Sequence, residues 1–203
     1  MNNIIISLSD KKDAVQIAKI HQQEINQGFL SQLGIGLLSK LYKAMTVSSN
    51  AFAVVAKDNG RVVGFIGGCT NVGKFYRDFL KKYFIQIVFI LLPKIFRIST
   101  LKKIFETLKY PKQEKEKNLP KAELLTIAVS KEFHGQGIAQ KMLEKFAFEM
   151  EKRGINVFKV VVGESLSQAI KYYEKMGFEF HSSCSIHGKE LSRIYTYKVK
   201  PYS

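Results

Sequence analysis

Two glycines, Gly135 and Gly137, lie between an apolar run and an amphipathic one, and this stretch carries the clearest chemical signal in the sequence. The run Leu124–Val129 is typical of a buried strand, and the spacing of apolar residues from Ile138 predicts a helix that ends at Gly154. A strand, a glycine turn and a helix in this order direct backbone N–H groups and the positive end of the helix dipole at one point. The sequence therefore predicts a phosphate site.

Three known phosphate-binding patterns compete for these glycines, and two of them fail. In a Walker loop, lysine and then serine or threonine follow the last glycine, whereas Ile138 and Ala139 stand there in this sequence. A dinucleotide-binding fingerprint begins at the end of its strand and has a third glycine. Here residues 131–134 separate the strand from Gly135 and the third glycine is absent, although Glu164 mimics the ribose-binding acid. The third pattern is favoured.

The third pattern consists of two segments, H-G-Q-G-I-A at residues 134–139 and A-I-K-Y-Y-E-K-M-G-F at residues 169–178. They resemble the GNAT family of N-acetyltransferases, whose signature reads Gln/Arg-x-x-Gly-x-Gly/Ala. The order of expected strands and helices agrees as well, so the resemblance covers most of the chain and leaves out residues 73–118. It implies an α/β fold with an α+β mixed sheet, the acyl-CoA N-acyltransferase (GNAT) fold, and acetyl-coenzyme A (acetyl-CoA) as co-substrate.

The small residues of this signature have a physical role. A side chain at Gly135 or Gly137 would obstruct the pyrophosphate of the cofactor, and Ala139 is small at the helix start for the same reason. The resemblance implies cofactor contacts for the following residues: Ile127, Ala128, Val129, His134, Gly135, Gln136, Gly137, Ile138, Ala139, Gln140, Ser165, Ala169 and Tyr173. It also implies that a backbone N–H near Ala128 or Val129 polarises the thioester carbonyl.

Two positions depart from the family's pattern. His134 replaces the usual glutamine or arginine, which changes the side-chain contact but leaves the backbone cradle formed by the glycines. Leu166 stands where the family often has asparagine, so we expect Ser165 or Ser167 to take over that contact with the cofactor.

Direct attack by an amine requires two proton transfers, one from the attacking ammonium and one to the departing thiolate. Tyr173 matches the family's tyrosine and is the expected acid, whereas Tyr172 points about 100° away around the helix. The base has several candidates. Glu123 resembles the catalytic glutamate of the histone-acetyltransferase branch of the family. His21 and Glu24 lie where the family builds its acceptor pocket, and a water chain is the further alternative.

The rest of the sequence predicts the elements that hold these residues. Strands are expected at residues 4–8, 51–57, 61–69, 124–129, 156–163, 178–185 and 194–199, and helices at about 10–25, 32–45, 138–153 and 167–176. The pair Asn59-Gly60 predicts a hairpin between the second and third strands. Residues 1–203 are expected to form one domain, with a basic helical insertion at about 73–118 between strands 3 and 4.

The insertion carries twelve basic side chains against four acidic ones, which is more than half of the net charge of +15. Such a surface favours anionic partners, although lysine-rich surfaces also occur without one. Its apolar run Tyr83–Leu92 is shorter than the roughly 20 residues that span a bilayer. Three interpretations remain for this run: a buried helix that covers the sheet, a dimer contact, or an interfacial helix on an anionic membrane.

The sequence therefore predicts an acetyl-CoA-dependent N-acetyltransferase that acts on a primary amine of a small molecule, such as an amino sugar or a sugar nucleotide. The alternative is a module that binds a membrane or another anionic partner and keeps an acyl-CoA site for sensing. No motif indicates nucleic acid as a partner. A rate that depends on salt concentration would favour the anionic acceptors, because salt screens charge.

Two cysteines are too few for a disulfide framework, and the N-terminus lacks the pattern of a secretory signal. These features predict a cytoplasmic protein, monomeric or homodimeric, with attachment to the inner face of the membrane as an alternative. His181, Cys184 and His187 fall on an expected strand, where alternation separates the cysteine from the histidines. We therefore expect no metal.

Overall fold

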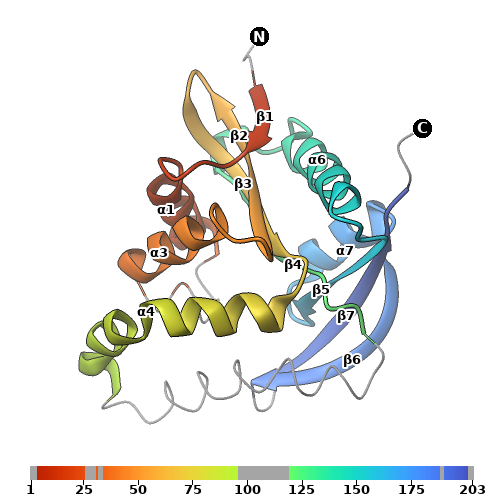
Figure 1. The fold of residues 1–203 in the computed structure, drawn as a ribbon. Helices are drawn as coiled ribbons and strands as arrows, with labels where there is room; N and C mark the ends of the chain where they lie inside the picture. The colour runs from red at the N-terminus through yellow and green to blue at the C-terminus, as the bar shows by residue number, and fades with distance from the viewer. Residues whose placement is uncertain (1–3, 26–30, 32–33, 96–118, 188–189, 201–203) are drawn as a thin grey trace.

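A computed structural model of the 203-residue chain describes residues 4–25, 31, 34–95, 119–187 and 190–200 (Figure 1). In this part of the chain, the strands form one seven-stranded sheet in the order β1-β2-β3-β4-β5-β7-β6. Its strands are β1 (Ile4–Leu8), β2 (Ala51–Asp58), β3 (Arg61–Cys69), β4 (Glu123–Val129), β5 (Val157–Gly163), β6 (Glu179–His187) and β7 (Glu190–Lys198). Every neighbouring pair is antiparallel except β4 and β5, which are parallel. The predicted mixed sheet and the predicted order of strands and helices along the chain are confirmed.

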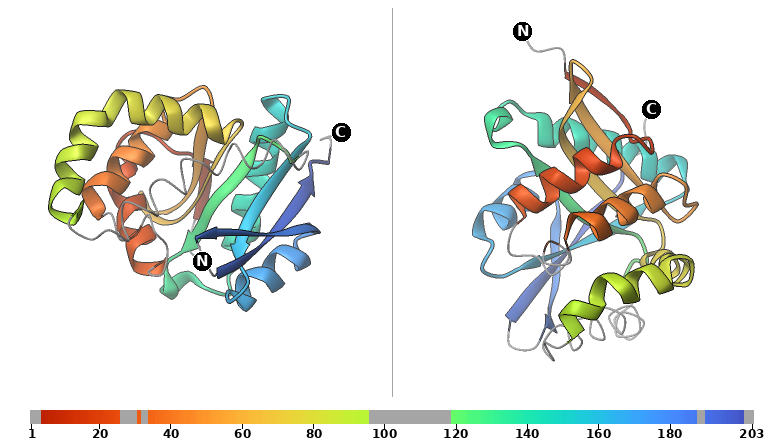
Figure 2. Two further views of the ribbon diagram at one scale, coloured as in Figure 1. Left: turned by 90° about the horizontal axis from the view of Figure 1, so that it is seen from below. Right: turned by 90° about the vertical axis from the view of Figure 1, so that its left-hand side faces the viewer.

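Helices cover both faces of this sheet (Figure 2). They are α1 (Ala14–Glu24), α3 (Ile35–Met45), α4 (Val72–Ile95), α6 (Ile138–Lys152) and α7 (Ser167–Lys175), with a 3₁₀ turn η2 (Lys131–Phe133) before α6. One apolar core joins α1, α3 and the first half of α4 to the sheet. A second core joins α6 and α7 to the opposite face. The two faces are called the α1 face and the α6 face below.

The glycine-rich strand β3 lets α6 approach the sheet closely. Phe146 of α6 stacks on Phe52 at 4.9 Å and packs edge-on against Phe158 at 5.3 Å, measured between ring centroids. A Cβ atom added at Gly68 would lie 2.5 Å from the Phe146 ring and 2.5 Å from the carbonyl oxygen of Glu123. Gly68 is therefore required by the packing of this ring, which agrees with the expectation of a close approach at β3.

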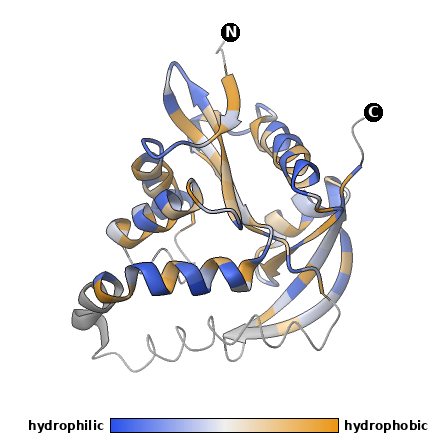
Figure 3. Ribbon diagram, viewed as in Figure 1, coloured by the Kyte–Doolittle hydropathy of each residue, from blue (hydrophilic) through white to orange (hydrophobic). Residues whose placement is uncertain are grey.

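The predicted insertion begins with α4, and residues 96–118 lie outside the described part of the chain. Val72, Phe75 and Phe79 of α4 are buried against the α1 face. Phe84 and Ile85 are 63% and 69% exposed, which excludes burial for these two side chains of the apolar run. The reason is helical periodicity, since they fall on the side of α4 away from α3. Figure 3 shows both kinds of residue along this helix.

None of the described helices combines the length and the apolar character needed to cross a membrane. The α4 helix has charged residues throughout its first half, Lys74, Arg77, Asp78, Lys81 and Lys82.

Candidate functional site

The candidate site is organised by the point at which β4 and β5 separate. In the described residues, these parallel strands pair only at Glu123 with Lys159 and at Leu124 with Val160. Beyond Leu124, β4 stays paired with β3 as far as Val129, while β5 pairs with β7 instead. The edge of β4 that faces β5 therefore has no strand partner among the described residues beyond Leu124. We call this region the β4–β5 split.

A bulge in β4 sets the direction of the backbone groups along the split. Gly68 lies opposite Leu124 and Gly67 lies opposite Thr126, so Leu125 is an extra residue in β4. One extra residue reverses, for the rest of the strand, which backbone groups point toward which neighbouring strand. The bulge thus decides what β4 presents to the split.

Alternation identifies the groups that face the split. The N–H of Ser130 donates to the carbonyl oxygen of Val63 in β3 at 2.8 Å. Because successive residues of a strand alternate, the N–H of Ala128 also points toward β3, whereas those of Ile127 and Val129 point toward the split. Of the two N–H groups expected to face a thioester, the geometry thus directs that of Val129 into the split and adds that of Ile127.

The predicted glycine loop lies just beyond the open end of the split. Gly135 and Gly137 have φ angles of +76° and +72°, a left-handed conformation that strains any residue with a Cβ atom. Apart from the chain neighbours of each glycine, no heavy atom of the described residues lies within 4 Å of the place that a Cβ would take there. The protein therefore leaves open the space that a bulky anion needs beside these two residues.

The N-terminus of α6 faces the same space. Gly137 is its N-cap residue and makes no side-chain cap, and the first helical bond runs from Lys141 N–H to the Gly137 carbonyl oxygen at 3.1 Å. The N–H groups of Ile138, Ala139 and Gln140 precede that bond and belong to the positive end of the helix dipole. This donor set suits a pyrophosphate.

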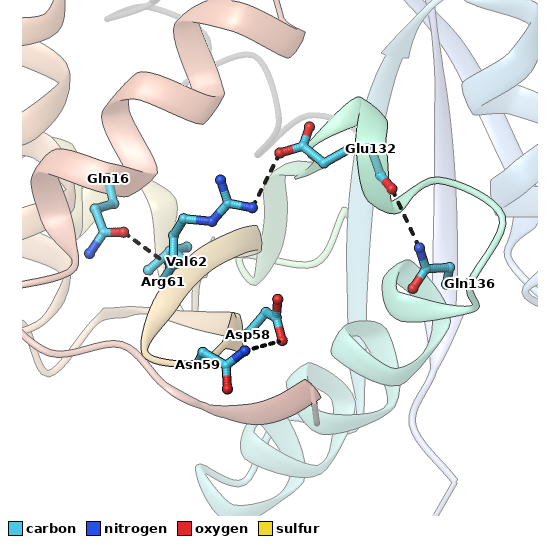
Figure 4. Close-up of polar contacts among 7 residues, drawn as sticks. All are labelled: Gln16, Asp58, Asn59, Arg61, Val62, Glu132 and Gln136. Carbon is cyan, nitrogen blue, oxygen red and sulfur yellow. Dashed lines mark hydrogen bonds and ion pairs between the residues drawn. The ribbon is translucent and has the colours of Figure 1, made fainter. Parts of the chain in front are cut away.

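Side-chain contacts hold both ends of the loop. The ring nitrogen Nε2 of His134 lies 2.7 Å from the carbonyl oxygen of Val129, so this side chain is turned back onto β4. Arg61 of β3 forms an ion pair of 3.5 Å with Glu132 (Figure 4). Gln136 donates to the backbone oxygen of Glu132 at 3.4 Å in the same view. The side chain that departs from the family's pattern thus supports the loop from within.

The two tyrosines of α7 lie on the α6 face. Tyr173 is buried and packs against Phe178 at a centroid distance of 5.1 Å. Burial, and then the neighbouring Tyr172, raises the pKa of Tyr173. Burial, and then Glu144, raises the pKa of Tyr172, whose hydroxyl is buried without a hydrogen-bond partner among the described residues. Both phenols therefore keep their protons at neutral pH.

The start of α7 carries the other residues predicted for the cofactor. Ser165 and Ser167 are exposed, and Ala169 is half-buried. Leu166, at the position where the family often has asparagine, is the N-cap residue of α7 and makes no side-chain cap. It is 46% exposed.

His21 lies on the α1 face, across the sheet from Tyr173. Its Nδ1 atom is 2.5 Å from the hydroxyl of Tyr42, and its ring stacks on Phe65 at 6.1 Å. Burial lowers the pKa of His21 from 6.5 to about 4, so the ring is neutral at physiological pH. Glu24, which we predicted beside it, is half-buried, and its side chain makes no hydrogen bond or ion pair with the described residues. His21 and Glu24 are thus not joined by a hydrogen bond.

Glu123 stands at the closed end of the split, and its side chain is on the α1 face. Only 6% of Glu123 is exposed, and its Oε2 atom lies 3.2 Å from the Nζ atom of Lys159. Lys159 and Tyr42 are not among the site residues that the sequence predicts. A lysine within an otherwise apolar strand is a signal that could have identified Lys159, whereas nothing in the spacing of α3 marks Tyr42.

Comparison with known proteins agrees with this geometry. The sequence pattern of the Acetyltransferase (GNAT) family matches residues 23–178, well over half of the chain. The chain belongs to the GNAT family. The alanine N-acetyltransferase of ribosomal protein bS18 from Escherichia coli K12 is 38% identical over 60 residues, which cover 30% of this chain and 40% of that GNAT relative. The match thus spans well under two thirds of the curated relative's length.

Solved structures show the same fold at low sequence identity. The ribosomal-protein-S18-alanine N-acetyltransferase from Escherichia coli has a TM-score of 0.60 at 16% identity, covering 98% of this chain and 96% of that one. The yncA protein from Salmonella typhimurium, solved with its cofactor acetyl-CoA, has a TM-score of 0.62 at 13% identity, covering 100% and 97%. The paiA N-acetyltransferase from Thermoplasma acidophilum, solved with coenzyme A, has a TM-score of 0.60 at 14% identity, covering 96% and 99%.

Within the part of the chain that the structure describes, no group of three or more His, Cys, Asp and Glu side chains is arranged to hold a metal ion. His181 and Cys184 lie on β6.

The lowered pKa of His21 predicts a pH-dependent stability. Between pH 6.5 and about 4, the unfolded chain binds a proton at His21 that the folded chain excludes, so the free energy of unfolding falls as pH decreases through this window. His21 contributes about 3 kcal/mol to the change in the free energy of unfolding across this window. We expect His21→Gln to remove it in urea unfolding at the two ends of the window.

The exposed His181 provides the matched control, because His181→Gln should leave the pH dependence unchanged. A wild-type pH dependence in the His21→Gln variant would contradict the assignment.

Proposed function

We propose that this chain is an acetyl-CoA-dependent N-acetyltransferase that moves the acetyl group to a primary amine by direct attack. Residues 1–203 act as one GNAT domain with a basic helical insertion at about 73–118. The observation that carries the proposal is that the glycine loop follows the open end of the β4–β5 split. Backbone N–H groups of β4 that lack a strand partner among the described residues are thus followed directly by a loop that can hold a pyrophosphate.

Residues along this line fit acetyl-CoA. The N–H groups of Ile138, Ala139 and Gln140 would hold its pyrophosphate. Ser165, which lies two residues before the start of α7, would make a further contact with the cofactor. Of the outward N–H groups of Ile127 and Val129, one would pair with an amide of its pantetheine arm as an added strand does, and the other would face the thioester. Bound there, acetyl-CoA supplies the thioester that an amine attacks.

The chain's own groups then stabilise charge and move two protons. The N–H of Val129 or Ile127 donates a hydrogen bond to the carbonyl oxygen as negative charge develops on it. The hydroxyl of Tyr173 donates a proton to the leaving sulfur, and its raised pKa keeps that proton available at neutral pH. Glu123 accepts the proton of the amine at the closed end of the split, directly or through a water. These roles account for both protons.

The α1 face receives the acceptor, with His21 and Glu24 in its pocket. Support for an anionic small molecule, such as a sugar nucleotide that carries an amine, comes from the charge of α3 and α4. Their half-buried or exposed basic side chains are Lys40, Lys43, Lys74, Arg77, Lys81 and Lys82. Asp78 is the acidic residue of these two helices, so the field there attracts anions.

A protein N-terminus is the second candidate acceptor. It is favoured by the sequence match to an enzyme named for acetylating an alanine of ribosomal protein bS18. A free α-amino group has a lower pKa than a lysine side chain and gives the neutral nucleophile more readily at neutral pH.

A thiol-release assay with acetyl-CoA tests the function. The acceptor panel contains amino sugars, an amino-sugar nucleotide, spermidine and a peptide with an N-terminal alanine. We expect release with one of these classes, and a rate that falls with salt for the sugar nucleotide. Tight coenzyme A binding without release on any amine would instead favour the sensing module.

The loop geometry predicts the effect of Gly137→Ala. Alanine in the left-handed conformation costs about 1–2 kcal/mol. The free loop of the variant relieves this strain and must take it up again to bind, which corresponds to a roughly tenfold weaker affinity for coenzyme A. Gly36→Ala is the matched control, because Gly36 is helical and open space surrounds its Cβ position. Calorimetry should show unchanged binding for Gly36→Ala, and equal affinities of the two variants would contradict the cradle.

The position of Tyr173 predicts the effect of Tyr173→Phe. Without the phenol, the thiolate leaves unprotonated, and kcat should fall about 10²-fold or more with little change in KM for acetyl-CoA. Tyr172→Phe is the control on the adjacent position. It removes a buried hydroxyl without a described partner, so stability and kcat should be unchanged or improved. A normal kcat for Tyr173→Phe would remove this residue from the mechanism.

A further inference from the structure

Lys159 is a buried cation at the closed end of the split. It is 0% exposed, which is rare for lysine unless its charge is paired. Its Nζ atom lies 3.2 Å from Oε2 of Glu123 and donates to the carbonyl oxygen of Pro120 at 2.6 Å. Its backbone N–H donates to the carbonyl oxygen of Ala122 at 3.0 Å. One residue of β5 thus holds β4 and the segment before it at three points.

These contacts occur where the split begins. Cys69, Glu123 and Lys159 occupy one row across β3, β4 and β5, and the next pair, Leu124 with Val160, is the last between β4 and β5 in the described residues. The row faces α4 because Cys69 belongs to the core of the α1 face.

Other titratable groups surround the row from the elements packed on it. Burial raises the pKa of Cys69, Glu123 raises it further, and Lys159 opposes them. Burial, Cys69 and Glu123 raise the pKa of Tyr76 on α4. Lys159 is therefore the cation of a buried cluster in which the other members are acids.

We propose that Lys159 is a positioning residue for the acetyl transfer. It holds the carboxylate of Glu123 at the closed end of the split and fixes the place where β4 and β5 separate. The inference rests on the proposed function, in which Glu123 accepts the amine proton and becomes a neutral acid. The base Glu123 is thus held in place by a partner on β5, beneath the inserted helix α4.

The effect of removing the Lys159 charge on the pKa of Glu123 has a predictable direction. A buried carboxylate without its cation favours the protonated form, so its pKa rises. A protonated Glu123 cannot accept a proton, and the acidic limb of the kcat–pH profile therefore moves to higher pH. A merely structural pair would change stability and leave the position of this limb where it was.

Four variants distinguish a positioning role of Lys159 from a merely structural one. They are Lys159→Met, Lys159→Arg, Glu123→Gln and the double variant that combines Lys159→Met with Glu123→Gln. For Lys159→Met we expect kcat at neutral pH to fall about 10²-fold, the scale of a lost general base, with the acidic limb shifted upward. Lys159→Arg keeps the positive charge and should leave the acidic limb of the kcat–pH profile at its wild-type position. The double variant should regain the melting temperature lost in Lys159→Met, because no buried charge remains alone, while its kcat stays at the level of Glu123→Gln.

Lys57→Met is the matched control for the loss of an ion pair. Lys57 contacts the buried Asp13 at 2.8 Å, at the start of α1 and away from the split. The Lys57→Met substitution should lower the melting temperature and leave kcat, the acidic limb of the kcat–pH profile and the affinity for coenzyme A unchanged.

Coenzyme A affinity, measured by calorimetry, keeps the inference separate from the proposed function. Because Lys159 fixes the split, Lys159→Met should bind coenzyme A about tenfold more weakly, equal to about 1.4 kcal/mol. Wild-type protein that binds coenzyme A but releases no thiol with any amine would refute the acetyl transfer, and the affinity of Lys159→Met would still decide the positioning. Unchanged affinity, an unmoved pH limb, or a double variant that regains kcat together with stability would overturn it.

Discussion

The loss of pairing between β4 and β5 is the constraint on which the site depends. Two parallel strands that begin in register at Glu123 and Lys159 and then separate leave one edge of β4 without a strand partner in the described part of the chain, which ordinarily costs free energy. The chain tolerates this edge because β3 holds the other side of β4 over its whole length. The bulge at Leu125 then turns the groups of Ile127 and Val129 into the opening.

The sheet also divides the chemistry between its two faces. The α6 face carries the glycine loop at its end and the buried phenol of Tyr173, whereas the α1 face carries His21 and the carboxylate of Glu123. Groups from the two faces can act on one reacting centre only at a place where the sheet is interrupted. In the proposed mechanism, the split supplies that place for the proton donor Tyr173 and the proton acceptor Glu123, which lie on opposite faces of the sheet.

The insertion adds a third layer to this arrangement. Its helix α4 packs its first half on α3 and on the end of β3, so Tyr76 lies over the row that contains Glu123. Basic residues and the exposed Phe84 and Ile85 share its outer side. A family fold thus gains, beside the closed end of the split, a basic surface of its own next to the buried pair of Glu123 and Lys159.

The sequence by itself determined the elements and the loop. Periodicity and turn residues located the strands and the two helices α6 and α7, and the signature around Gly137 identified the family, because each of these depends on neighbours along the chain. The tertiary structure alone decided three other matters. The direction of the Val129 N–H depends on a bulge set against β3, the pairing of Lys159 with Glu123 joins distant strands, and the exposure of Phe84 depends on which side of α4 meets α3. Contacts between distant segments leave no periodic trace in a single sequence, so only the folded chain reveals them.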